Sequence, residues 1–248
     1  MNTPEAPERS ADLSLYGDGN ASINRRTLIC AATTFLAIPA YARNVRAPTA
    51  DPVARARAAM GGAALLARVR AIGWTGTARV MTAGRPLELG VETRIEPFVR
   101  ARTDSWLIEE GRVEKRTLMI EGQQGFVVFK GRQVALPPAE AEHERQQFGI
   151  YGHMLLVGTA VPRGAGIMSV RAGYPDALLA PGRDGMPSVA AYVIESPDST
   201  GTLRERFTFS GSVTDQGLRW PQRIAMTRNG AAFSTLTIDE LTVELFGT

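Results

Sequence analysis

The stretch that decides the fold is residues 74–136, which read WTGTARVMTAGRPLELGVETRIEPFVRARTDSWLIEEGRVEKRTLMIEGQQGFVVFKGRQVAL. Apolar and polar side chains alternate along it, so that Leu87 and Leu89 share one face and Glu88 and Glu92 share the other. A period of two is typical of strands with one buried face and one solvent-exposed face. Glycine-containing turns divide the stretch, and we expect an antiparallel meander of six strands over 74–81, 87–95, 98–109, 112–121, 124–130 and 133–136.

A helix is expected on each side of this meander. The Ala-, Leu- and Arg-rich segment 52–72 predicts one that is kinked or split at Gly61 and Gly62 and that ends at Gly73. Segment 139–157 predicts the other, because its aromatic and aliphatic residues form a stripe with helical spacing.

The C-terminal part returns to strands. Residues 158–187 hold six Gly and four Pro, which predicts a long loop with short strands. In the tail, 188–246, Asn229-Gly230 is a strong hairpin signal, since both residues tolerate positive φ. The apolar parity flips near Asp239, which predicts a β-bulge there.

Together these segments predict a mainly β (α+β) fold in a single domain, residues 43–248. About ten long antiparallel strands would curl into a half-barrel, and the helices would cover its concave side.

Composition argues against a nucleic-acid partner. The chain has 248 residues, with 28 Lys+Arg against 25 Asp+Glu, which gives a formal charge of +3. That charge is small for the length, and no run of basic residues is present to follow a phosphate backbone.

The N-terminus has the pattern of an export signal. Arg25 and Arg26 precede an apolar run over 27–40, and Ala40 and Ala42 form an A-x-A cleavage site. The paired arginines are typical of a twin-arginine signal, although the general secretory route stays open. The run is shorter than the roughly 20 residues of a spanning helix, which argues against an uncleaved anchor. We therefore expect residues 1–42 to be removed and the mature protein to be periplasmic.

Signatures of catalysis or metal binding are absent from the sequence. The single cysteine, Cys30, lies inside the signal, so the mature chain would hold no thiol. His143 and His153 are ten residues apart, which is not the i,i+4 spacing of a helical metal pair. No H-E-x-x-H or G-x-S-x-G motif occurs. We expect no cofactor, no metal and no enzymatic activity.

What remains is apolar surface within a curled sheet. Large apolar side chains are spread over the expected strands and the second helix. They could line a cavity for an acyl chain, or they could form a solid core. The candidates for ligand binding are Trp74, Trp106, Phe126, Phe129, Phe148, Met154 and Trp220.

The order of elements resembles the periplasmic outer-membrane lipoprotein carrier family, with its LolA/LolB-like fold. Three local motifs are similar: FVRARTDSW at 98–106, IEGQQGF at 120–126 and GLRWP at 217–221. The resemblance implies a half-barrel cavity for a lipid or an acylated lipoprotein, with no catalysis. The alternative is a periplasmic sensor or envelope-assembly module that binds a membrane-associated protein partner on the same sheet.

Overall fold

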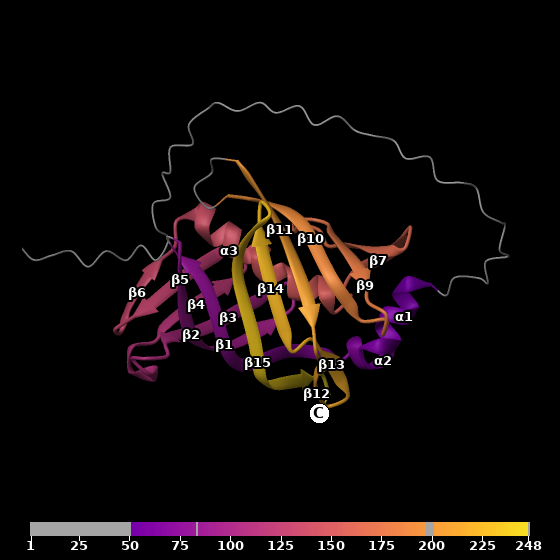
Figure 1. Ribbon diagram of the computed structural model, residues 1–248, viewed down its shortest axis with the longest axis horizontal. Coiled ribbons are helices and arrows are strands. Elements are labelled where there is room, and N and C mark those ends of the chain that lie inside the picture. Colours follow the sequence, from indigo (N-terminus) through magenta and orange to yellow (C-terminus); the bar gives the residue numbers. More distant parts are fainter. Residues whose placement is uncertain (1–50, 83, 197–200, 248) are drawn as a thin grey trace, which may run out of the picture.

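A computed structural model describes residues 51–82, 84–196 and 201–247. The expected signal segment, with Arg25, Arg26, Ala40 and Ala42, lies outside these residues. Within them, the chain forms three α-helices, a short 3-10 helix and fifteen strands (Figure 1).

The six-strand meander is confirmed. Its strands lie side by side in sequence order, and each pairs antiparallel with the next. A 3-10 turn, η1, separates the third strand from the fourth. The elements are β1 (Val69–Thr82), β2 (Arg85–Glu96), β3 (Arg100–Leu107), η1 (Arg112–Glu114), β4 (Arg116–Glu121), β5 (Gln124–Phe129) and β6 (Arg132–Ala135).

The rest of the chain extends the same sheet from the other side of β1. The last long strand pairs with β1, so the two halves form one thirteen-stranded sheet in the order β6-β5-β4-β3-β2-β1-β15-β14-β11-β10-β9-β8-β7. Its further strands are β7 (Thr159–Arg163), β8 (Gly166–Val170), β9 (Ala177–Pro181), β10 (Pro187–Glu195), β11 (Thr202–Ser210), β14 (Arg223–Arg228) and β15 (Ala231–Leu245). A separate hairpin consists of β12 (Val213–Asp215) and β13 (Leu218–Trp220).

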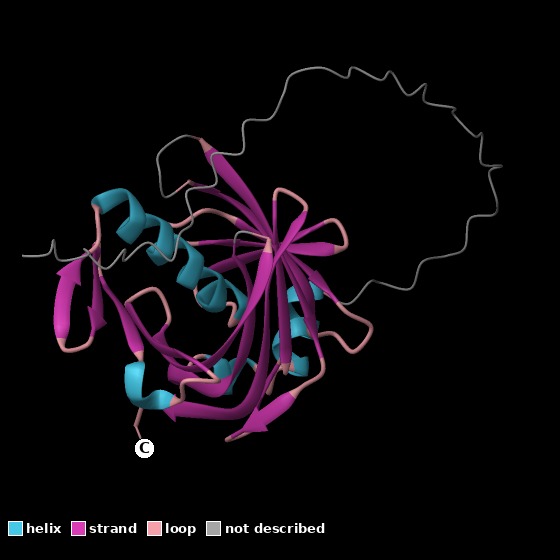
Figure 2. Cartoon of the chain, turned by 60° about the vertical axis from the view of Figure 1, so that its left-hand side comes forward, coloured by secondary structure: helices cyan, strands magenta, loops and turns pink. Residues whose placement is uncertain are grey.

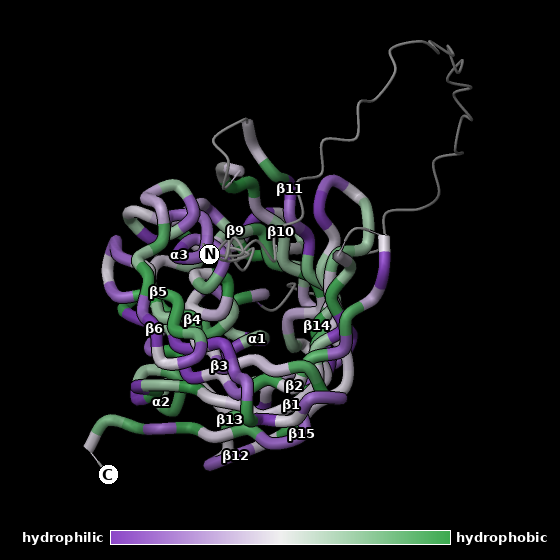
Figure 3. Tube along the Cα trace, turned by 90° about the vertical axis from the view of Figure 1, so that its left-hand side faces the viewer, coloured by the Kyte–Doolittle hydropathy of each residue, from purple (hydrophilic) through white to green (hydrophobic). Residues whose placement is uncertain are grey.

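The sheet is a curved, open half-barrel, as expected from the sequence. Figure 2 shows it curling around the long helix α3, Pro138–Met154. Strands β1 to β6 form the first wing of the half-barrel, and β7 to β11, β14 and β15 form the second wing. This helix contacts β4 and β5 on the first wing and β9 and β10 on the second. In Figure 3 the strands of the two wings lie on either side of it. Because α3 bridges both wings, it covers the concave side where the apolar face of the sheet would otherwise meet water.

The first helical segment is split, as predicted, but it ends earlier. Helix α1 (Pro52–Ala59) and helix α2 (Ala63–Leu66) flank Gly61-Gly62, and β1 already begins at Val69. The prediction of helix to residue 72 was wrong because pairing decides the conformation there. Ile72 lies between Ile95 of β2 and Val243 of β15, and it is fully buried.

Two details of the C-terminal strands are as the sequence predicted. Asn229 and Gly230 have φ of 48° and 87° and form the hairpin between β14 and β15. Thr75 pairs with Glu240, and the next residue, Gly76, pairs with Ile238. Asp239 is therefore the extra residue of a bulge, which returns the following apolar side chains to the concave face.

The Gly- and Pro-rich segment 158–187 contains short strands, as the sequence predicted. It contributes β7, β8 and β9, which continue the sheet to its far edge.

Among the described residues, no helix is both long enough and apolar enough to cross a membrane.

Candidate functional site

A cavity of about 510 Å³ lies between the concave face of the sheet and α3. Its size falls within the roughly 300–1,000 Å³ of typical small-molecule sites. Strands β1 to β4, strands β11, β14 and β15, and helix α3 all contribute side chains. Most of them are apolar, including Ala78, Val80, Leu87, Leu89, Val91, Leu118, Phe207, Ile224, Met226, Phe233 and Leu236.

Strand alternation explains why these side chains meet. Ala78 lies opposite Leu89 on the neighbouring strand and opposite Leu236 on the other side. Val80 in the same way lies opposite Leu87. Because residues two apart on a strand share a face, these pairs form successive apolar rows along one wall of the cavity.

One stripe of α3 forms the opposite wall. Glu144, Gln147, Phe148 and Tyr151 follow helical spacing and line the cavity together. The ring of Tyr151 lies 5.0 Å from that of Trp74 on β1. Burial raises the pKa of the Tyr151 hydroxyl well above its usual value, so the group stays neutral.

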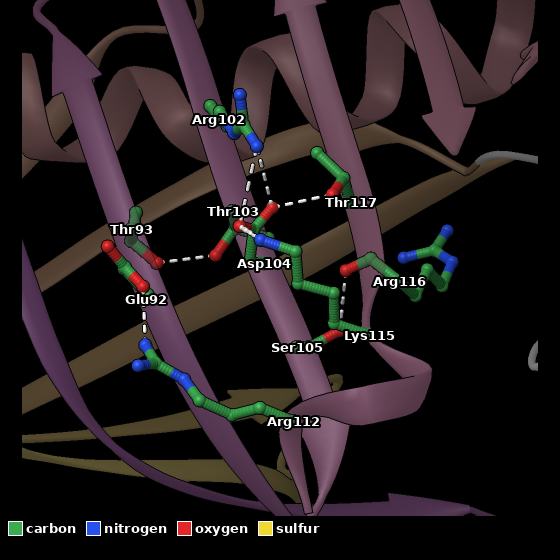
Figure 4. A network of polar contacts seen from close by, with 10 residues as sticks. All are labelled: Glu92, Thr93, Arg102, Thr103, Asp104, Ser105, Arg112, Lys115, Arg116 and Thr117. Carbon is green, nitrogen blue, oxygen red and sulfur yellow. Dashed lines mark hydrogen bonds and ion pairs between the residues drawn. The ribbon is translucent and has the colours of Figure 1, made fainter. Parts of the chain in front are cut away.

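A polar band interrupts the apolar wall on the wing of β2 to β4. Thr93 on β2 lies directly opposite Thr103 on the neighbouring strand β3, and their hydroxyls are hydrogen-bonded. Ser105 and Arg116 form the next cross-strand pair, and the Ser105 hydroxyl donates to the Arg116 carbonyl at 3.5 Å. All four residues line the cavity and are labelled in Figure 4.

Helix α3 is held to the second wing by a buried ion pair. The Glu205 carboxylate is fully buried and accepts hydrogen bonds from Arg228 Nε at 2.7 Å, from the Tyr192 hydroxyl at 2.7 Å and from Gln147 Nε2 at 3.1 Å. Arg228 Nη2 also lies 3.1 Å from Nε2 of His143. Since Gln147 and His143 belong to α3, this cluster ties the helix to β10, β11 and β14.

The opposite, convex face of the first wing carries a separate set of charges. Asp104 accepts hydrogen bonds from Lys115 Nζ and Thr117 Oγ1, both at 2.6 Å (Figure 4). Burial alone would raise the pKa of Asp104, but these hydrogen bonds outweigh it, and the pKa falls below its usual value. The cluster stabilises the outside of the sheet and does not reach the cavity.

Two of the seven candidate residues, Trp74 and Phe148, line the cavity. Met154 and Trp220 are fully buried in the surrounding core. Ligand contact by any of the candidates stays a prediction.

The other three candidates lie elsewhere on the first wing. Trp106 is on the convex face, because the alternating residues Thr103 and Ser105 face the cavity. Phe126 pairs with Met119 on that same face, and Phe129 pairs with Arg116 near the end of β5. None of the three contributes to the wall of this cavity.

The two histidines are both buried but belong to separate environments. His143 is next to Arg228, whereas Nδ1 of His153 lies 2.9 Å from the Ser169 hydroxyl. Burial lowers the pKa of His153 to about 4, although Asp176 and the Pro175 carbonyl oppose that shift. In the described part of the chain, no group of three potential metal ligands comes together.

The polar residues of the site were not found from the sequence. Arg116, Glu205 and Arg228 are separated by many residues and carry no motif. One available signal is a charged residue at an inward-facing strand position, which Arg228 shows beside Met226 and Ile224. Reading that signal requires knowing which face is inward.

Comparisons with known proteins bear on the fold. No protein-family model matches the chain, and no curated protein matches its sequence. Solved structures similar to it in fold include the following three. A LolA superfamily protein from Nitrosomonas europaea has 12% identity and a TM-score of 0.47, and the alignment covers 70% of this chain and 86% of that one.

The other two are similarly distant. A domain named for outer membrane lipoprotein sorting, from Vibrio parahaemolyticus, has 8% identity and a TM-score of 0.46, covering 72% of this chain and 86% of that one. A DUF1329 family protein from Desulfovibrio piger has 10% identity and a TM-score of 0.46, covering 74% and 89%. The likeness of these three structures to the chain concerns the fold alone, at TM-scores of 0.46 to 0.47.

Proposed function

We propose that this protein binds a lipid or another acylated ligand in the cavity beneath α3, without catalysing a reaction on it. The observation that carries the proposal is the cavity itself, about 510 Å³ with mainly aliphatic and aromatic walls. Burying an acyl chain there would remove apolar surface from water at about 0.8 kcal/mol per methylene.

The surroundings of the cavity support binding in preference to catalysis. Its charged groups are spread over different elements, and the Arg228 guanidinium is paired with the buried Glu205 carboxylate. The Ser169 hydroxyl beside His153 is itself fully buried and is not part of the cavity wall. A ligand could not reach that pair without unpacking the core.

A chain-length series of fluorescent fatty acids tests the proposal. Affinity should rise by about threefold to fourfold for each added methylene until the cavity is full. Ala78→Trp places a large side chain on the cavity wall and should abolish binding. Thr77→Trp adds the same side chain to the other face of β1 and should leave binding intact.

The result that would contradict the proposal is equal, weak affinity for all chain lengths, unchanged by Ala78→Trp. An empty cavity of that kind would favour the alternative, a module that holds a protein partner on the same sheet. We further propose that the protein acts in the periplasm after removal of residues 1–42, which is supported by the sequence pattern described above.

A further inference from the structure

Arg116 differs from the ion-paired cations of the first wing because it faces the cavity. On the convex face, Arg94, Arg112 and Lys115 each form an ion pair with a carboxylate. Arg116 is half-buried and lines the cavity. Among residues 51–82, 84–196 and 201–247, no carboxylate forms an ion pair with its guanidinium.

The position of Arg116 also distinguishes it from Arg228, the other arginine on the cavity wall. Arg228 is neutralised by Glu205, and its guanidinium lies 3.7 Å from the ring centre of Phe233. In the part of the chain that the structure describes, Arg116 has neither a carboxylate nor an aromatic ring as a partner. In Figure 4 its guanidinium points away from the Asp104 cluster. A cation half-removed from water without a partner is unfavourable, and an anion that arrives with a ligand would relieve that cost.

The neighbours of Arg116 fit the rest of such a ligand. Ser105, directly across the strand pair, offers a hydroxyl that can turn toward a bound oxygen. Two pairs further along the same strands, Leu118 faces the cavity beside Thr103. Beyond Thr103 lie Thr93 and then Trp74, one strand after another across the sheet. Ser105 also lies opposite Val91 of β2. A headgroup on Arg116 and Ser105 would therefore leave its chain near Val91, Leu118 and Trp74, which all line the cavity.

We propose that the cavity selects an amphiphile with a singly charged anionic headgroup, a carboxylate or a phosphodiester, and that Arg116 binds that headgroup. This inference rests on the proposed function, since it presupposes an acyl ligand in the cavity. One guanidinium balances one negative charge, whereas a doubly charged headgroup would leave a charge uncompensated beside the apolar walls. An arginine fork suits both headgroups because each presents two oxygens.

The test compares probes that differ only in the headgroup. Laurate and methyl laurate share one chain, and lysophosphatidylglycerol supplies the phosphodiester. Binding is measured by calorimetry at pH 8, below the micelle concentrations. The unmodified protein should bind laurate about tenfold more tightly than the ester. Acetate and dimethyl phosphate, which have the charged group but no chain, should show no measurable binding.

Variants assign the preference to Arg116. Arg116→Gln should bind laurate and the ester equally, with ester affinity unchanged, and Arg116→Lys should keep part of the preference. Arg163→Gln is the matched control, because Arg163 is exposed on β7 at the far edge of the sheet. Thermal unfolding of each variant verifies that it is folded.

The outcomes separate this inference from the proposed function. Equal affinity for laurate and the ester in the unmodified protein would overturn the headgroup assignment alone. A tenfold preference that survives Arg116→Gln would overturn it too. Tight binding of the tailless anions would show a site for free anions in place of a lipid headgroup. If no chain-bearing probe binds, the proposed function fails as well.

Discussion

Trp106 shows how a single residue stabilises the outside of the sheet. Its ring covers Gly90 on the neighbouring strand so closely that a Cβ at Gly90 would lie 2.3 Å from Cε2 of the ring. The Arg112 guanidinium lies 4.5 Å from the ring centre and also pairs with Glu92. The tryptophan thus packs on backbone that only glycine leaves open.

This stack predicts the effect of filling the space. Gly90→Val should displace the indole and lower the free energy of unfolding by about 1–3 kcal/mol, measured by urea denaturation. In a Trp106→Ala background the same substitution should cost much less, because the clash is gone. Equal costs in both backgrounds would show that the stack is not the cause.

His153 gives the molecule a defined response to acid. Its pKa is lowered to about 4 by burial, whereas in the unfolded chain it is about 6.5. As the pH falls from about 6.5 to 4, the unfolded state takes up a proton that the folded state does not. Stability should therefore decrease over that range, by roughly 1–3 kcal/mol from this residue.

Comparison with a non-titrating variant isolates the contribution of His153. His153→Gln should lose less stability than the unmodified protein between pH 7 and pH 4.5 in urea denaturation, while acidic groups titrate equally in both. Identical losses would mean that His153 is protonated as readily in the folded state as in the unfolded one.

At the scale of single residues, the sequence indicated which side chains are large and apolar, but not which face of the sheet each of them occupies. Trp74 and Trp106 were equal candidates for the cavity, yet they lie on opposite faces of the sheet. The difference depends on strand register, which long-range pairing sets. Arg116 was missed for the same reason, because a strand that begins with one basic residue does not show which way that residue faces.

Among the elements, α3 depends most on long-range contacts. The buried cluster around Glu205 holds it to the second wing through Gln147 and His143. Arg228→Met keeps the packing on Phe233 but leaves the Glu205 carboxylate without a cation. Unfolding free energy should fall by about 3–5 kcal/mol.

A double variant separates the buried charge from the packing. Glu205→Gln combined with Arg228→Met should recover most of the lost stability, since the uncompensated carboxylate is removed. Hydrogen exchange should show α3 less protected in the single variant than in the double one. If the double variant is as unstable as the single one, then the cluster acts through shape and not through charge.

Elements whose signals are local were predictable from sequence. The Asn229-Gly230 hairpin requires positive φ, and the bulge at Asp239 follows from a flip in apolar parity. The helix expected over 52–72 instead ends at Leu66, because residues from Val69 onward gain partners on two strands. Segment 158–187 holds three short strands, β7, β8 and β9, where the sequence predicted a long loop with short strands.

For the whole molecule, the curved open sheet follows from the sequence, but the cavity does not. Arg116 comes from the first wing and Arg228 from the second, and both reach the same space only because β1 pairs with β15. Composition and periodicity could not separate an open cavity from a solid core, since both use the same apolar side chains.

Export of the whole chain is a prediction that lies outside the described residues. Changing Arg25→Lys and Arg26→Lys together should block export if the twin-arginine route is used. Fractionation of the periplasm measures this, and intact mass should show the exported protein beginning at Arg43. Unaffected export would assign the protein to the general secretory route.

The measurement that tests the central claim most directly is mass spectrometry of lipids extracted from the mature protein after gentle purification. The account predicts one acyl-bearing molecule per protein, with a single negative charge on its headgroup, and its loss in Ala78→Trp. Recovery of an empty protein, which also gains no thermal stability from any acyl lipid, would contradict the account.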